Sequence, residues 1–129
     1  TLYAEIENPA EVSDPNSVKV VAQDNGQAIY FSRSPIPAAR DFASPRDAMT
    51  AGVRYRRHLG LYAYRRSALE WFVQTPATAL ERAEKLEQLR FLEHGRRVVL
   101  ARARASIPGG VDTREDLERV RAALASSPE

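Results

Sequence analysis

The sequence predicts a domain of the α/β or mixed α+β class, with a mixed sheet and flanking helices. Short runs of alternating apolar and polar residues, typical of half-buried strands, dominate the first half of the chain. Runs with apolar residues three or four apart, each preceded by a helix-start pattern, dominate the second half. The predicted strands are residues 1–7, 17–22, 27–32, 54–64 and 98–104, and the predicted helices are residues 67–73, 78–94 and 113–124.

The composition limits the kinds of chemistry that the chain can carry. Its 129 residues fit one domain. The absence of cysteine excludes disulfides and cysteine-bound zinc and suits a reducing, cytoplasmic compartment. No stretch reaches the ~20 apolar residues of a membrane span, and no charged-then-apolar stretch resembles a signal peptide, so we expect a soluble chain without a membrane partner. The net charge is only +2, and 17 of the 19 basic residues are arginines, which suit carboxylates and phosphates.

The first third of the chain predicts a strand, a connection and a hairpin. Leu2, Ala4 and Ile6 alternate with polar neighbours directly from Thr1, so we expect the chain to be a piece of a longer protein. Residues 8–16 contain two prolines and read as a connection. Asp-Asn-Gly at residues 24–26 separates two alternating runs, a strong hairpin pattern. The two prolines of residues 34–37 predict an extended exit from this hairpin.

The middle of the chain contains a short helix pattern and a basic strand pattern. In residues 44–47, a serine can cap a helix that starts at the following proline. In residues 54–64, alternation places Tyr55, Leu59, Leu61 and Ala63 on one face. The other face carries Arg56, His58, Gly60, Tyr62 and Tyr64. The residues allow either a half-exposed basic strand or a binding face with a gap at Gly60.

Three capping patterns predict the starts of the later helices. Ser67 and Glu70, then Thr78 and Glu81, have the spacing of capping boxes, and residues 113–116 repeat the pattern. Five apolar residues at helical spacing predict that residues 78–94 form one helix that ends near a glycine: Leu80, Ala83, Leu86, Leu89 and Leu92. We expect Glu81 and Lys85 to pair on this helix. In the last helix, Leu117, Val120 and Leu124 are expected to face inward.

The candidate functional residues have two readings each. Asp112 follows a Pro-Gly-Gly turn and either starts the last helix or binds Mg²⁺, which prefers oxygen ligands. Glu84, Glu87 and Gln88 lie beside the apolar helix face, either in solvent or directed into a cleft. Arg33 and Arg40 flank the proline segment and are either ordinary surface residues or ligands for an anion.

Four motifs carry a resemblance to a known family. They read Ala-Ile-Tyr-Phe-Ser-Arg-Ser-Pro-Ile-Pro (28–37), Arg-His-Leu-Gly-Leu-Tyr-Ala-Tyr-Arg (57–65), Leu-Glu-Gln-Leu-Arg (86–90) and Gly-Val-Asp-Thr (110–113), the last followed by Glu-Asp-Leu-Glu-Arg-Val-Arg (115–121). In this order they resemble the C-terminal half of the 3-deoxy-manno-octulosonate cytidylyltransferases, or CMP-Kdo synthetases. The resemblance implies a Rossmann-like nucleotide-sugar-transferase sandwich. It also implies a cytoplasmic, dimeric, Mg²⁺-dependent enzyme that joins CTP and Kdo for lipopolysaccharide synthesis.

The resemblance assigns roles residue by residue. It makes Asp112 a catalytic, metal-binding aspartate, and it places Glu87 beside the sugar and Arg33 in a Ser-Arg motif. The sugar-contacting residues that it implies are Arg40, His58, Tyr62 and Gln88. Residues 1–129 are then the sugar-binding and dimer-forming half, and the N-terminal CTP-binding half with its phosphate loop is absent, so we expect the fragment alone to be inactive.

Two departures and two rival functions accompany this resemblance. The loop before Asp112 is one residue shorter than is usual in the family, and the stretch before residue 78 lacks a second proline. A nucleic-acid-binding module would use the arginines of residues 54–66. A noncatalytic dimerisation domain is the other alternative. The sequence also leaves open Kdo itself or a close analogue such as its 8-amino form.

Overall fold

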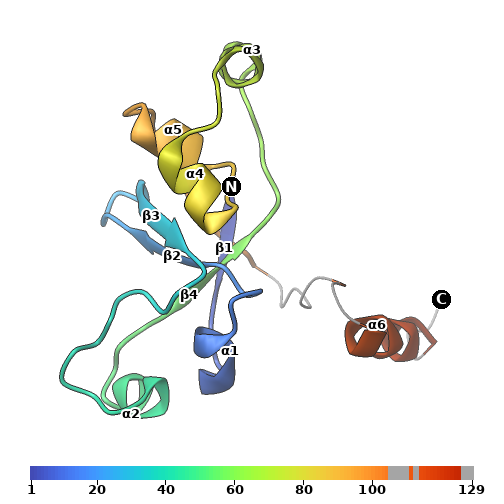
Figure 1. Ribbon diagram of the computed structural model, residues 1–129. Helices are drawn as coiled ribbons and strands as arrows, with labels where there is room; N and C mark the ends of the chain where they lie inside the picture. Colours follow the sequence, from blue (N-terminus) through green and yellow to red (C-terminus); the bar gives the residue numbers. More distant parts are fainter. Residues whose placement is uncertain (105–110, 112–113, 126–129) are drawn as a thin grey trace.

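The computed structural model describes residues 1–104, 111 and 114–125. Its centre is a five-stranded mixed sheet with the order β3-β2-β4-β1-β5 (Figure 1). The strands are β1 (Leu2–Glu5), β2 (Lys19–Ala22), β3 (Ala28–Ser32), β4 (Arg56–Leu59) and β5 (Ala101–Arg102). β1 pairs antiparallel with β4 and parallel with β5, and β2 pairs antiparallel with β3 and β4. The sheet and its flanking helices confirm the predicted α/β class.

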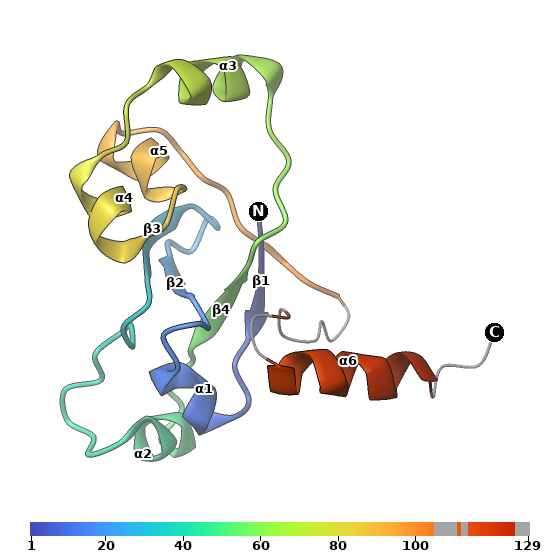
Figure 2. The ribbon, with the colours of Figure 1, turned by 45° about the vertical axis from the view of Figure 1, so that its right-hand side comes forward.

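The described part contains six helices around this sheet. They are α1 (Pro9–Ser13), α2 (Pro45–Thr50), α3 (Arg66–Gln74), α4 (Ala79–Glu84), α5 (Leu89–Glu93) and α6 (Arg114–Ala125). α4 and α5 lie beside β3, α1 and α2 lie together at the opposite end of the sheet, and α3 is reached by two extended segments (Figure 2). None of the helices within the described ranges is both long and apolar enough to cross a membrane.

The predicted hairpin is confirmed by β2 and β3. Gly26 has φ +82°, and its amide donates to Gln23 O at 2.9 Å. Asn25 Oδ1 accepts a hydrogen bond of 2.9 Å from the Gln27 amide, which fixes the turn. The predicted Ser44 cap is also confirmed, because its hydroxyl accepts from the Asp47 amide at the start of α2. The connection of residues 8–16 differs from the prediction: it contains α1, which starts because Asn8 accepts from the Ala10 amide and proline occupies the first turn.

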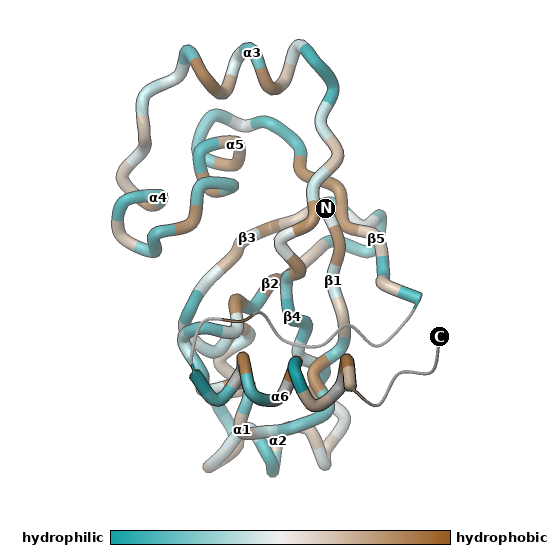
Figure 3. Tube along the Cα trace, turned by 90° about the vertical axis from the view of Figure 1, so that its right-hand side faces the viewer, coloured by the Kyte–Doolittle hydropathy of each residue, from teal (hydrophilic) through white to brown (hydrophobic). Residues whose placement is uncertain are grey.

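Two apolar clusters hold these elements together. The larger one packs the β2–β3 hairpin against the α4–α5 region and contains Val20, Ala28, Phe31, Leu86, Leu89 and Leu100. The smaller one packs α1 and α2 together at the end of the sheet and contains Ile6, Val12, Ala48 and Tyr55. Apolar residues also occur in α3 at the edge of the molecule (Figure 3), where Leu69 and Val73 remain exposed.

The strand predicted for residues 54–64 is shorter in the structure. The ladder ends at Leu59, and residues 60–65 have no strand pairing. Tyr55 and Leu59 are buried as expected, whereas Leu61 is 58% exposed, so the predicted inner face fails beyond β4. The predicted strand of residues 98–104 is likewise reduced to the short β5.

The predicted helix starts are partly wrong. α3 begins at Arg66 after Arg65, so Ser67 lies inside the helix and does not cap it. Residues 78–94 form two helices, because Lys85 has φ +56° and ends α4. Glu81 accepts from the Thr78 amide as the capping box requires, but it pairs with Arg90 instead of Lys85.

The predicted last helix is confirmed as α6. The prediction that its apolar residues face inward is not confirmed. Leu117 is 38% and Leu124 71% exposed, because α6 lies apart from the sheet (Figures 1 and 2). The cap expected at Thr113 lies outside the described residues.

Candidate functional site

An open pocket of about 800 Å³ lies between α3, α5 and the extended segment that follows β4. Tyr62, Tyr64 and Arg65 line it from the extended segment, and Ser67 and Ala68 from the first turn of α3. The opposite side consists of Gln88 and Phe91 of the α5 region. The rest of the lining is Thr1, Ala63, Gly95, Arg96, Arg97, Val98 and Val99. Two of the residues predicted to contact the sugar, Tyr62 and Gln88, therefore share one pocket.

His58 lies next to this pocket and contacts Tyr62. Their ring centroids are 5.4 Å apart, and the other side of the imidazole meets the buried Phe31 edge-on at 4.9 Å. His58 Nε2 is 2.9 Å from the hydroxyl of Thr1, which also lies 2.7 Å from Leu61 O. A hydroxyl that donates to that carbonyl can accept from an Nε2–H, so this arrangement favours the neutral Nε2–H tautomer.

The electrostatic surroundings keep His58 uncharged near neutral pH. Burial lowers its pKa from 6.5 to about 4, and the positive amino group of Thr1 adds to the effect. His58 can therefore donate or accept a hydrogen bond, but it does not supply a positive charge at pH 7.

An aromatic series continues from His58 across the pocket. Tyr62 stacks on Tyr64 with centroids 5.4 Å apart, and Tyr64 stacks on Phe91 at 5.8 Å. Burial raises the pKa of Tyr62 and of Tyr64, and the negative charge of Glu87 raises both further. The phenols therefore remain protonated and can donate hydrogen bonds to a polar ligand.

Gln88 enters the pocket because of the break between α4 and α5. Lys85 turns the chain in a left-handed conformation, and Gln88 then occupies the N-cap position of α5. Gln88 is 6% exposed and lines the pocket, whereas the neighbouring Glu87 is exposed. An amide at this position offers both a donor and an acceptor to a hydroxylated ligand.

Arg33 does not line the pocket and instead makes hydrogen bonds to backbone carbonyls. Its Nε donates to Glu84 O and its Nη1 to Pro15 O, both at 2.8 Å. Glu84 also accepts from the Ser32 hydroxyl at 2.6 Å and from the Arg33 amide at 2.9 Å. These bonds join the end of β3 to the end of α4, and α4 leads to Gln88.

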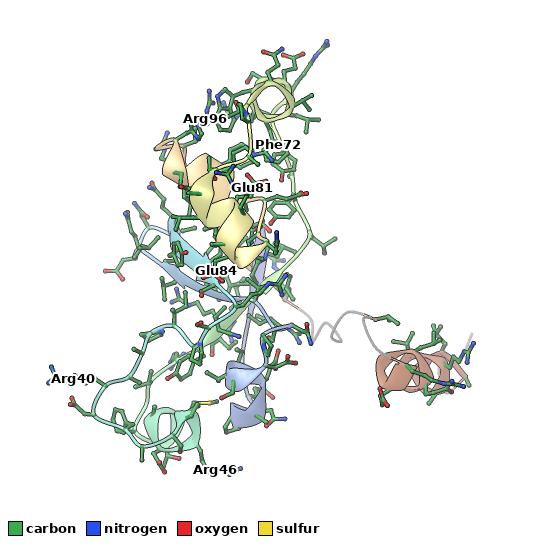
Figure 4. All side chains as sticks on the ribbon, in the orientation of Figure 1. Arg40, Arg46, Phe72, Glu81, Glu84 and Arg96 are labelled. Atoms are coloured by element: carbon green, nitrogen blue, oxygen red, sulfur yellow. The ribbon has the colours of Figure 1, made fainter. Side chains whose placement is uncertain are left out.

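Of the remaining predicted residues, Arg40 does not line this pocket. Arg40 is exposed and lies at the opposite end of the molecule from Phe72, Glu81 and Arg96 (Figure 4). Asp112 lies outside the described residues. No group of three His, Cys, Asp or Glu side chains that could hold a metal ion occurs in the part of the chain that the structure describes.

The arginines around β4 are engaged within the protein. Arg54 pairs with Glu5 at 3.4 Å, and Arg57 pairs with Glu11 at 3.0 Å. Arg56 lies over the ring of Tyr3 at 5.1 Å, and Arg66 pairs with Glu70 at 2.7 Å. Acidic partners therefore offset the charges of Arg54, Arg57 and Arg66.

Sequence reasoning missed several residues of the pocket. Phe91 follows Gln88 by three positions and therefore shares its helix face, a signal that was available. Arg96 and Arg97 follow α5 and reach the pocket only because the chain folds back there, so sequence spacing carried no such signal. Arg96 lies 4.0 Å from the Trp71 ring centre.

The fold and the polar aromatic pocket identify the class of the protein when they are combined with the family comparison. Residues 1–98 match the family described as cytidylyltransferase. This match covers more than half of the chain, and the chain belongs to the cytidylyltransferase family.

Individual relatives share a more particular name. The 3-deoxy-manno-octulosonate cytidylyltransferase of Xanthomonas campestris pv. campestris (strain 8004) is 49% identical over 128 residues, covering 98% of this chain and 51% of that protein. Its namesake from Pseudomonas syringae pv. syringae (strain B728a) is 52% identical over 125 residues, covering 96% of this chain and 49% of that protein.

A solved structure agrees with these relatives. CMP:2-keto-3-deoxy-manno-octonic acid synthetase, complexed with CTP, superposes with a TM-score of 0.82 and 42% identity, covering 97% of this chain and 48% of that chain. The chain thus spans about half the length of the relatives it matches.

Proposed function

We propose that this chain is the sugar-binding and dimer-forming half of a 3-deoxy-manno-octulosonate cytidylyltransferase. The complete enzyme transfers CMP from CTP to Kdo and releases pyrophosphate, for lipopolysaccharide synthesis in the cytoplasm. One observation carries the proposal: Tyr62 and Gln88 line one pocket, with His58 against Tyr62, in a chain 49% identical to an enzyme of that name. The chain covers 51% of that relative, which supports assigning CTP binding to the other half of the complete enzyme.

The pocket chemistry suits a hydroxylated acid. Tyr62 and Tyr64 are neutral donors, and Gln88 supplies an amide donor and acceptor. Arg65, Arg96 and Arg97 lie on the lining, where a guanidinium can pair with a carboxylate. In our proposal Arg40 also contacts the sugar, although it does not line this pocket.

The proposed reaction is an in-line displacement at phosphorus. The anomeric oxygen of Kdo forms a bond to the α-phosphorus of CTP, the bond from that phosphorus to the bridging oxygen breaks, and pyrophosphate leaves with its electron pair. The hydroxyl proton passes to solvent or to a base. The contribution of this chain is to hold the sugar with its hydroxyl correctly directed, which removes much of the entropic barrier.

A divalent metal, Mg²⁺ in our proposal, offsets the charge of the triphosphate when it is bound. Asp112 fits this ion because a carboxylate oxygen is a suitable ligand for a hard cation. The described residues offer no complete donor set. We therefore expect the remaining ligands to come from the CTP-binding half and from the phosphates.

The experiment joins this chain to a CTP-binding half and measures pyrophosphate release. We expect turnover that requires CTP, Kdo and Mg²⁺ together, and absence of turnover dependent on both substrates would overturn the proposal.

Gln88→Ala should raise the KM for Kdo, whereas Gln23→Ala in the exposed hairpin turn should not. Asp112→Asn should lower turnover even at saturating Mg²⁺. Sedimentation of the joined protein tests the dimer, and a parallel assay with the 8-amino analogue tests the sugar.

A further inference from the structure

Arg90 of α5 contacts two other helices through one guanidinium group. Its Nη1 donates to the carbonyls of Phe72 and Thr75, at the end of α3, at 3.0 and 2.9 Å. Its Nε donates to Glu81 Oε2 of α4 at 2.7 Å, and its Nη2 pairs with the other carboxylate oxygen. The guanidinium also lies over the Phe72 ring at 3.9 Å. One side chain therefore joins α3, α4 and α5.

The carboxylate of Glu81 is buried and held in a fixed orientation for its contact with Arg90. The side chains of Glu81 and Arg90 are 9% and 13% exposed. Glu81 also accepts from the Thr78 amide at 3.2 Å, which fixes its orientation. The bidentate pairing of a planar guanidinium with a carboxylate is directional. It therefore fixes the relative positions of the helices in addition to its electrostatic attraction.

The helices joined by Arg90 form opposite sides of the pocket. α3 contributes Ser67 and Ala68, and the α5 region contributes Gln88 and Phe91. Aromatic contacts accompany the polar ones, since Trp71 and Phe72 of α3 pack on Phe91 at 5.2 and 5.3 Å. Figure 2 shows α3 connected to the rest of the protein by extended segments on both sides. Its position over the pocket therefore depends on these side-chain contacts.

We propose that Arg90 is a positioning residue that holds the α3 wall against the α5 wall and thereby sets the width of the pocket. It does not line the pocket, and it acts on the ligand through Ser67, Gln88 and Phe91. The identity of the ligand, an acid sugar, rests on the proposed function. The clamping of α3 does not depend on it.

Arg90→Lys tests the hydrogen-bond geometry of the guanidinium separately from its positive charge. A single ammonium keeps the positive charge but cannot make the paired bond to Glu81 and also reach both carbonyls in the same plane. Trp71 is the only tryptophan in the chain and lies on α3, so its fluorescence reports the position of that helix. We expect greater acrylamide quenching of Trp71 in the variant. We also expect a Kdo dissociation constant about tenfold higher, the scale of one lost hydrogen bond to a charged group.

Arg82→Lys is the matched control. Arg82 is exposed on α4 and donates to Ala77 O, so it undergoes the same chemical change without touching α3. Its quenching and binding should equal those of the unaltered chain. Unchanged Trp71 quenching in a folded Arg90→Lys chain overturns the proposal, whatever happens to binding.

A second variant covers the case in which Arg90→Lys does not fold. Glu81→Gln combined with Arg90→Met removes both buried charges together, so neither is left unpaired. It should fold by circular dichroism and still show increased Trp71 quenching, and unchanged quenching overturns the clamp. If the unaltered chain and its joined form fail to bind Kdo, the proposed function falls, while the quenching comparison still decides the role of Arg90.

Discussion

His58 shows how burial decides the charge of a single residue. Its pKa is lowered to about 4, against about 6.5 in an unfolded chain. Between these values the unfolded state binds a proton that the folded state does not. Above pH 6.5, His58 therefore does not reduce the free energy of unfolding. As the pH falls from 6.5 toward 4, that free energy decreases by at most about 1.4 kcal/mol per pH unit.

Replacing His58 should remove this pH dependence. We expect the difference in unfolding free energy between pH 7 and pH 5 to be smaller in His58→Gln than in the unaltered chain, as measured by urea denaturation. His94→Gln is the control, because His94 is the other histidine and is exposed. A pH dependence that disappears with His94 and persists without His58 would contradict the assignment.

At the residue level, the sequence placed the pocket residues together for a reason that was only partly correct. Strand alternation put His58 and Tyr62 on one face, and their rings do meet. However, the strand ends at Leu59, and the contact depends on an extended segment that turns back beside Thr1. Alternation could not predict this path, because it describes only side chains within a paired strand.

At the element level, the break at Lys85 is the main departure from the sequence pattern. Leu86 and Leu89 continue the apolar spacing of α4, so periodicity alone predicts one continuous helix. The left-handed turn at Lys85 is instead stabilised by packing of both leucines into the core and by the Glu81–Arg90 pair. A pair nine residues apart has no signature in helical spacing, which favours partners three or four residues apart.

Substitution of Lys85 distinguishes the two-helix structure from a continuous helix. Glycine accepts φ +56° without the cost of about 1–2 kcal/mol that a side chain carries there. We therefore expect Lys85→Gly to keep or slightly raise the free energy of unfolding, whereas in a continuous helix it would cost about 1 kcal/mol. Lys85→Val should destabilise, because a branched side chain is poorly tolerated at positive φ. Urea midpoints of the two variants give the sign, and a loss with glycine would contradict the break.

At the scale of the whole molecule, residues 96–103 connect parts that are distant in sequence. Ala28 N donates to Val98 O, and Leu100 N donates to Gly26 O, which attaches this segment to the hairpin turn. Ala101 N donates to Thr1 O, which attaches it to the start of β1. The sequence predicted a strand here but not its partners, since pairing between distant segments depends on the complete topology. The same segment carries Arg96 and Arg97 into the pocket, so its attachment also shapes the site.

Gly26 is the position at which this attachment can be tested. A Cβ there would lie 3.3 Å from Leu100 O, and the residue has φ +82°. Gly52 also has positive φ, at +98°, but a Cβ there meets nothing within 4 Å. Both glycine-to-alanine changes therefore incur backbone strain, and only Gly26→Ala also pushes on the Leu100 carbonyl. We expect Gly26→Ala to lose more stability than Gly52→Ala.

Two measurements separate a local effect at the turn from loss of the long-range attachment. Urea denaturation gives the difference between the two variants, and amide hydrogen exchange at Leu100 and Ala101 shows where it arises. Faster exchange at both amides in Gly26→Ala, with unchanged exchange in Gly52→Ala, is the expected result, because displacement of the Leu100 carbonyl disturbs the pairing on both sides of the segment. Equal stability losses with unchanged exchange would show that strain at the turn is the whole effect and that a Cβ at residue 26 does not displace the Leu100 carbonyl.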